Sequence, residues 1–204
     1  MEEYIENSIT FPQYESLIDG LLAEGKTTGK NQSEAMVGYG KLNRQRMHRL
    51  EKTVVINEEL RTAAQNLARP MIWLVITEGW CGDAAQNVPV IEKIAAESDK
   101  IKTRYILRDE NLDLMDRFLT NGTRSIPKLI ALDSESLEVL GSWGPRPAAA
   151  QEFFAKMTSN GTEKAVILEE MQRWYNADKG QSIQHEFAKL LSGWEHNHTA
   201  AAGK

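Results

Sequence analysis

The chain has little cysteine: Cys81 is the single one among 204 residues, so no intramolecular disulfide can form. This excludes the class of small secreted domains that are held together by disulfides. Long hydrophobic runs are also missing. The longest, 71–76, is far shorter than the ~20 residues that span a bilayer. The first ten residues lack the basic and apolar segments of a signal peptide. We therefore expect a cytoplasmic protein without membrane contacts, in which the cysteine stays reduced.

Basic charge is in short supply as well. The chain carries 24 Lys and Arg residues against 29 Asp and Glu residues, a formal net charge of −5. Binding to nucleic acid requires a basic surface, so we expect no nucleic-acid partner. The stretch 41–52 is locally basic and is predicted to be a solvated helix face, with partner binding as the alternative. The sequence pattern does not indicate which oligomeric state the protein adopts.

No metal site is expected either. The four histidines show no ligand spacing with the cysteine, and two of them, His196 and His198, lie near the end of the chain. The acidic residues at 109–116 are predicted to be the solvated start of a helix, where the helix dipole favours negative charge. We therefore expect no bound metal and no resident cofactor.

What the sequence does contain is a regular alternation of strands and helices. Continuous apolar or β-rich runs predict strands at 71–78, 101–107, 127–132 and 137–143. Helical spacing predicts helices over part of 1–24 and over 34–51, 57–68, 83–98, 112–119, 148–157, 163–176 and 182–191. The residues from 196 onward are expected to be flexible.

The order of these elements indicates the fold class. From 70 to 158 it is strand, helix, strand, helix, strand, strand, helix. A strand–helix–strand start gives a parallel pair with a right-handed crossover, and the later strand hairpin is antiparallel. We therefore predict an α/β fold, with a small mixed sheet of about four strands covered by helices.

Three local motifs identify a family. The sequence Trp80-Cys81-Gly82 follows the first strand, and Pro89 lies eight residues after the cysteine. The segment RSIPKLIAL at 124–132 contains an Ile–Pro pair at the third strand. In this order of elements, the motifs resemble the thioredoxin superfamily over residues 68–158. The resemblance implies a thioredoxin-like domain there, with helical extensions at 1–67 and 159–204.

The departures from the family pattern are equally informative. Ala84 stands where thioredoxins carry the second, resolving cysteine, and Asp83 stands where they carry a proline between the two cysteines. Val75 occupies the position of the buried aspartate that helps to deprotonate the resolving cysteine. The resemblance therefore implies that the usual dithiol–disulfide cycle is absent, and that any redox chemistry uses a single thiol.

The resemblance also implies a site. Cys81 would be the catalytic thiol, with Gly82 and Asp83 following it. A cis Ile126–Pro127 bond would face it, and the backbone of Ile126 would bind an extended peptide or a glutathione moiety. The remaining implied substrate-binding residues are Trp80, as an apolar wall, and Arg124, as a cation for glutathione carboxylates. The substrate would be a protein disulfide or a glutathione mixed disulfide, with glutathione or another external thiol as co-substrate.

The reactivity of Cys81 stays open at this point. A helix N-terminus lowers the pKa of a thiol, whereas a nearby Asp83 raises it. Monothiol thiol–disulfide exchange or deglutathionylation is one hypothesis, and another glutathione-dependent reaction on the same fold is a second. The third is a redox-inactive binding module that holds a protein partner in the cis-proline groove or on its helical flanks. Packing of residues 1–67 over Cys81 would favour the binding module.

Overall fold

The protein is described by a computed structural model that covers the backbone of residues 1–201 and the side chains of residues 1–195. The strands are β1 (Met71–Thr77), β2 (Ile101–Leu107), β3 (Lys128–Asp133) and β4 (Val139–Trp143). The helices are α1 (Glu2–Glu6), α2 (Phe11–Ala23), α3 (Glu34–Thr53), α4 (Glu58–Gln65), α5 (Gly82–Ala95), η1 (Arg108–Glu110), α6 (Leu112–Asp116), α7 (Ala148–Ser159), α8 (Lys164–Asp178) and α9 (Gln181–Ala201).

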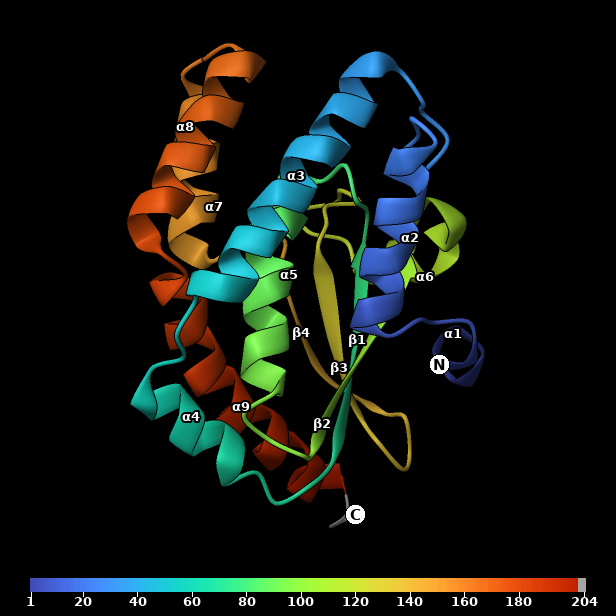
Figure 1. The fold of residues 1–204 in the computed structure, drawn as a ribbon. Helices are drawn as coiled ribbons and strands as arrows, with labels where there is room; N and C mark the ends of the chain where they lie inside the picture. Colours follow the sequence, from blue (N-terminus) through green and yellow to red (C-terminus); the bar gives the residue numbers. More distant parts are fainter. Residues whose placement is uncertain (202–204) are drawn as a thin grey trace.

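The four strands form one mixed sheet in the order β2-β1-β3-β4. Strand β1 pairs in parallel with β2, and β3 runs antiparallel to both β1 and β4. Because β1 lies between two partners under a layer of helices, nearly all of its residues are buried. This burial explains its continuous apolar sequence. The arrangement confirms the predicted thioredoxin-like α/β fold, with a sheet flanked by helices (Figure 1).

Three helices pack against one face of the sheet through aromatic side chains. Tyr105 on β2 stacks on Tyr14 of α2 at 5.4 Å and donates to Glu92 Oε1 of α5 at 2.5 Å. Trp73 on β1 makes edge contacts with Phe187 and Trp194 of α9. A single hydrophobic core therefore joins the sheet to helices that come from both ends of the chain.

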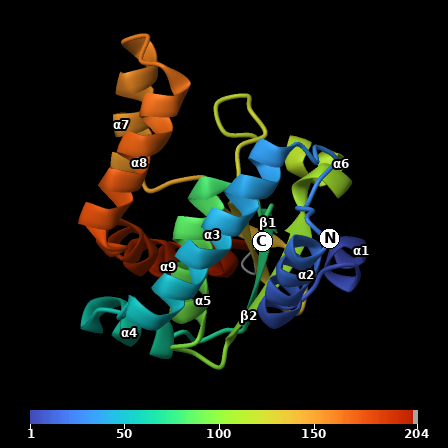
Figure 2. The same cartoon turned by 45° about the horizontal axis from the view of Figure 1, so that its top comes forward.

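A second, smaller core lies between α7 and α8. Its buried members are Ala150, Ile167, Met171 and Tyr175. In both views the α7–α8 hairpin stands to one side of the sheet, and α3 lies along α5 (Figures 1 and 2). The beginning of α5 therefore has helices from the two extensions on either side.

Several predicted helices differ from the structure at their ends. Those predicted for 57–68 and 83–98 end at Gln65 and Ala95. The helix predicted for 112–119 ends at Asp116, and the chain then turns at Asn121 and Gly122, both with positive φ. Helix α9 was expected to end near Leu191 but continues to Ala201, because Trp194 extends its apolar face. The side chains of His196 and His198 and the last residues, 202–204, lie outside the described part of the chain. No helix among the described residues is long and apolar enough to cross a membrane.

Candidate functional site

Cys81 lies at the junction between the sheet and α5. It is the N-cap residue of the helix, and its Sγ accepts a hydrogen bond from the amide of Ala84 at 3.5 Å. A short loop connects β1 to Cys81. Pro89 lies inside the helix, as predicted. The Cys81 side chain is only 8% exposed. The thiol therefore lies beneath the surface.

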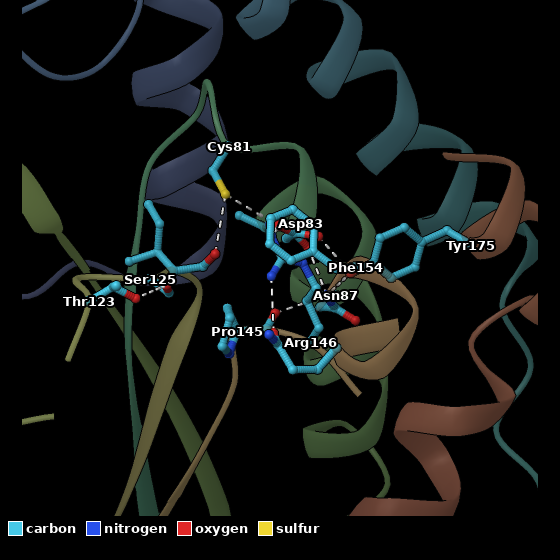
Figure 3. Close-up of polar contacts among 12 residues, drawn as sticks. Cys81, Asp83, Asn87, Thr123, Ser125, Pro145, Arg146, Phe154 and Tyr175 are labelled. Carbon is cyan, nitrogen blue, oxygen red and sulfur yellow. Dashed lines mark hydrogen bonds and ion pairs between the residues drawn. The ribbon is translucent and has the colours of Figure 1, made fainter. Parts of the chain in front are cut away.

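The thiol faces the segment that the sequence predicted. The Ile126–Pro127 peptide bond is cis, and Cys81 Sγ donates to the carbonyl oxygen of Ile126 at 3.3 Å (Figure 3). In the predicted groove, the Ile126 backbone would pair with an extended substrate. In this structure the Ile126 carbonyl accepts a hydrogen bond from the Cys81 thiol instead.

Burial decides the sign of the Cys81 pKa shift. The pKa is raised to about 12, first by burial and then by the charge of Asp83. The amides of Ala84 and Asp83 and the guanidinium of Arg146 act in the opposite direction. A pKa raised in this direction keeps the thiol protonated near neutral pH. Cys81 is therefore a neutral thiol, and the helix N-terminus does not overcome the cost of burying its charge.

Asp83 is held by a polar network. Its carboxylate pairs with Arg146 Nη2 at 2.7 Å and accepts from the hydroxyl of Tyr175 at 2.8 Å. Asn87 donates to the Tyr175 hydroxyl at 3.2 Å and to the carbonyl of Asp83 at 2.9 Å. These residues come from α5, α8 and the segment after β4 (Figure 3). The network therefore connects the start of α5 to the α7–α8 hairpin.

The Arg146 guanidinium interacts mainly with side chains of the protein. Its Nη1 donates to Gln151 at 3.0 Å, and its guanidinium lies over the ring of Phe154, 4.0 Å from the centroid. Its side chain is only 14% exposed. Arg146 therefore neutralises Asp83 and fixes α7, and its charge is not directed at solvent.

The loop before Cys81 is fixed by residues of the N-terminal extension. The amide of Gly79 donates to Thr28 Oγ1 at 2.8 Å, and the carbonyl of Gly79 accepts from Asn43 at 3.3 Å. Trp80 lies under the guanidinium of Arg108, 4.7 Å from the ring centroid. The extension thus packs on the Cys81 side of the domain, the arrangement that favours the binding-module hypothesis.

A pocket of about 380 Å³ opens above this loop, with α3 on one side and α8 on the other. Its lining residues are Met36, Tyr39, Leu42, Asn43, Arg46, Trp80, Cys81, Gly82, Asp83, Lys164, Leu168 and Gln172.

The pocket brings together only part of the predicted site. Trp80, Cys81, Gly82 and Asp83 line it, whereas Ile126, Pro127 and Arg124 do not. The Arg124 guanidinium instead pairs with both carboxylate oxygens of Asp116, at 2.6 and 2.7 Å.

The side chains that α3 and α8 contribute to the pocket were not predicted from the sequence. The available signal was a second apolar stripe on α3: Met36, Tyr39 and Leu42 lie beside the buried stripe of Val37, Met47 and Leu50. The Tyr39 and Leu42 side chains are each 43% exposed. The predicted helix boundaries were adequate, but the contact between α3, α5 and α8 depends on tertiary packing.

The acidic residues near 109–116 form ordinary surface interactions. Asp113 accepts from the hydroxyl of Tyr4, and Asp116 holds Arg124. Among the described side chains, no group of three or more His, Cys, Asp or Glu residues is placed to hold a metal ion.

The sheet order, the cysteine that caps α5 and the Ile126 carbonyl before the cis proline opposite it define a thioredoxin-fold protein. The sequence model of the thioredoxin family matches residues 29–159, and the chain belongs to this family. The match begins upstream of the predicted boundary at 68 and includes α3.

Two solved structures are similar to the whole chain. A Pseudomonas aeruginosa protein of unknown function is 17% identical, with a TM-score of 0.60, and the match covers 94% of this chain and 96% of that one. An HIV epitope scaffold is 18% identical, with a TM-score of 0.56 and coverages of 91% and 99%. These similarities show the fold alone. A search of curated proteins finds no match.

Proposed function

We propose that this protein is a redox-inactive thioredoxin-fold binding module whose ligand occupies the pocket above Cys81. The observation that carries this proposal is the state of the thiol. Cys81 is buried, donates a hydrogen bond to the Ile126 carbonyl, and has a pKa raised to about 12 by burial and Asp83. Thiol–disulfide exchange requires a thiolate, so this geometry supports a structural thiol.

The pocket supports the second half of the proposal. Pockets that bind small molecules occupy about 300–1,000 Å³ and combine apolar walls with a few polar groups. The pocket has about 380 Å³, apolar side chains from α3 and α8, and polar groups near Gly82. Its walls come from α3, which precedes the first strand, and from α8, which lies beyond the residues that the family model matches.

A monothiol oxidoreductase is the second candidate, and one observation favours it: Cys81 lines the pocket. In this reaction the Cys81 thiol would first lose its proton to solvent. The thiolate would then attack a glutathione mixed disulfide, form a disulfide with glutathione and release the protein thiol. A second glutathione would reduce that disulfide, regenerate Cys81 and leave as oxidised glutathione.

Alkylation of Cys81 by iodoacetamide, followed by mass spectrometry from pH 6 to pH 11, separates the two candidates. A binding module predicts almost no labelling of the folded protein at pH 7 and complete labelling in denaturant. A midpoint below the ~8.5 of a free cysteine, with rapid labelling, would establish a thiolate and favour the oxidoreductase. The Cys81→Ala variant is the control for labelling elsewhere.

A further inference from the structure

Two nitrogen donors converge on one point of the pocket floor. A methyl group added to the Cα of Gly82 would lie 3.6 Å from Gln172 Nε2 and 3.9 Å from Arg46 Nη1. Gln172 comes from α8 and Arg46 from α3, so the two side chains approach Gly82 from opposite walls. The absence of a side chain at Gly82 leaves space between them.

The Gln172 amide presents its oxygen to a neighbouring side chain. Gln86 Nε2 donates to Gln172 Oε1 at 2.7 Å. The oxygen of Gln172 is therefore the acceptor on the Gln86 side, and its NH₂ group is the donor that faces Gly82. Within the described part of the chain, no acceptor for this NH₂ group is present.

Arg46 brings a positive charge that the protein does not neutralise. Its Nη1 donates to Asn43 Oδ1 at 2.9 Å, and it forms no ion pair with any side chain of residues 1–195. Burial and the nearby Arg49 lower its pKa, as expected for a cation without a carboxylate partner. The acidic residue of the pocket, Asp83, is already paired with Arg146.

Other features add positive potential at the same place. Gly82 is the first residue of the 14-residue helix α5, and a helix N-terminus favours an anion. Lys164, at the start of α8, adds a second cation to the lining. The pocket therefore carries an excess of positive charge and hydrogen-bond donors.

The walls above these donors are apolar. Met36, Tyr39 and Leu42 come from α3, and Leu168 comes from α8. Leu168 is 40% exposed, and Tyr39 and Leu42 are each 43% exposed, so the pocket offers apolar surface to a ligand. The polar groups define where the charged end of that ligand lies.

We propose that the pocket binds a small carboxylate with an apolar body, such as a medium-chain fatty acid. The carboxylate lies in front of Gly82, between Arg46 and Gln172, and the apolar body lies between α3 and α8. This inference rests on the proposed binding function and names its ligand class. A volume of about 380 Å³ suits a free small molecule.

The test uses isothermal titration calorimetry of the whole protein with decanoate. Decyltrimethylammonium, which has the same chain and the opposite charge, and glutathione, which has carboxylates but no apolar body, are the comparison ligands. The proposal expects decanoate to bind and both comparison ligands to bind at least tenfold more weakly. Equal binding of the two decyl compounds, or tighter binding of glutathione, would overturn it.

Three variants locate the carboxylate. Arg46→Met removes the guanidinium, and Gln172→Glu keeps the acceptor for Gln86 while replacing the donor with a negative oxygen. Each should weaken decanoate about tenfold or more. Gly82→Ala places a methyl group in the anion position and favours the helix, so it should block binding without unfolding the protein. Arg49→Met, on the same helix but outside the pocket, removes only a more distant positive charge and should weaken decanoate much less than Arg46→Met.

The outcomes separate this inference from the proposed function. Iodoacetamide labelling of Cys81 is measured on the same protein. An inert thiol without decanoate binding overturns the carboxylate assignment alone, and a rapidly labelled thiol overturns the redox-inactive assignment whether or not decanoate binds. If Arg46→Met and Arg49→Met bind decanoate equally, the carboxylate position is wrong. If decanoate does not bind but a peptide with an apolar C-terminus does, the proposed small-molecule ligand is wrong and the ligand is a protein segment.

Discussion

The two sides of Cys81 are built differently. On the sheet side, the thiol meets the Ile126 carbonyl in a closed contact, and the adjacent strand β3 is buried throughout. On the helical side, α3 and α8 leave a pocket that is open to a ligand. The cis-proline side of the thiol is therefore closed, and the side that faces α3 and α8 is accessible. The retained motif is thus divided: Cys81 and Gly82 line the pocket, whereas Ile126 and Pro127 do not.

The largest effect is expected on the sheet side. Trp73 is fully buried and contacts Phe187 and Trp194. Trp73→Ala should lower the free energy of unfolding by about 3–5 kcal/mol, because it opens a cavity in the main core. Urea unfolding monitored by circular dichroism measures this change. Ile167→Ala, in the small core of the hairpin, is the comparison and should cost less, because it removes a smaller side chain from a smaller core; an equal or larger loss would contradict this ranking.

The next effect concerns the connection between the two sides. Arg146→Met leaves the carboxylate of Asp83 without its cation in a largely buried position. The free energy of unfolding should fall by about 3 kcal/mol, as when one partner of a buried ion pair is removed. Chemical denaturation provides the value. The double variant with Asp83→Asn should recover part of the loss, and no recovery would show that Arg146 acts mainly through Phe154 and Gln151.

The electrostatic difference between the two sides is tested by Asp83→Asn. The charge of Asp83 is the second cause that raises the pKa of Cys81, so its removal should lower that pKa from about 12. Burial is the first cause, so the pKa should stay above the ~8.5 of a free cysteine. The midpoint of iodoacetamide labelling against pH gives the value. A midpoint unchanged from that of the wild type would show that Asp83 has no influence on the thiol.

The smallest effect is expected on the outer side of α3. Glu15 on α2 pairs with Arg44 on α3 at 2.9 Å, and Glu51 pairs with the same guanidinium at 3.3 Å. Burial and then Glu51 raise the pKa of Glu15 to about 7.

A folded-state pKa above the unfolded value of ~4.3 makes a stabilising contribution that is complete below the unfolded value. That contribution is lost as the pH rises through about 7. Glu15→Gln should therefore flatten the decline of the melting temperature between pH 5 and pH 8. Thermal unfolding across this range measures it, and an unchanged slope would show that Glu15 titrates normally in the folded protein.

The frame of the fold was predictable because its signals are local. The apolar run of β1, the Trp80-Cys81-Gly82 sequence and the Ile126–Pro127 pair each lie within one short segment. The state of the thiol was not predictable, because the opposing effects of the helix N-terminus and Asp83 are outweighed by burial, which depends on the whole fold. The pocket was not predictable either, because its walls come from segments more than one hundred residues apart.

The hairpin α7–α8 has a consequence for how this protein diversifies. Its hydrophobic contacts are largely internal, and polar groups such as Tyr175 join it to the start of α5. Its sequence can therefore change, or be exchanged as a unit, with little cost to the packing of the sheet, provided that the partners of Asp83 are kept. Because α8 forms one wall of the pocket, changes in this hairpin can alter ligand preference without altering the ability of the sheet to fold.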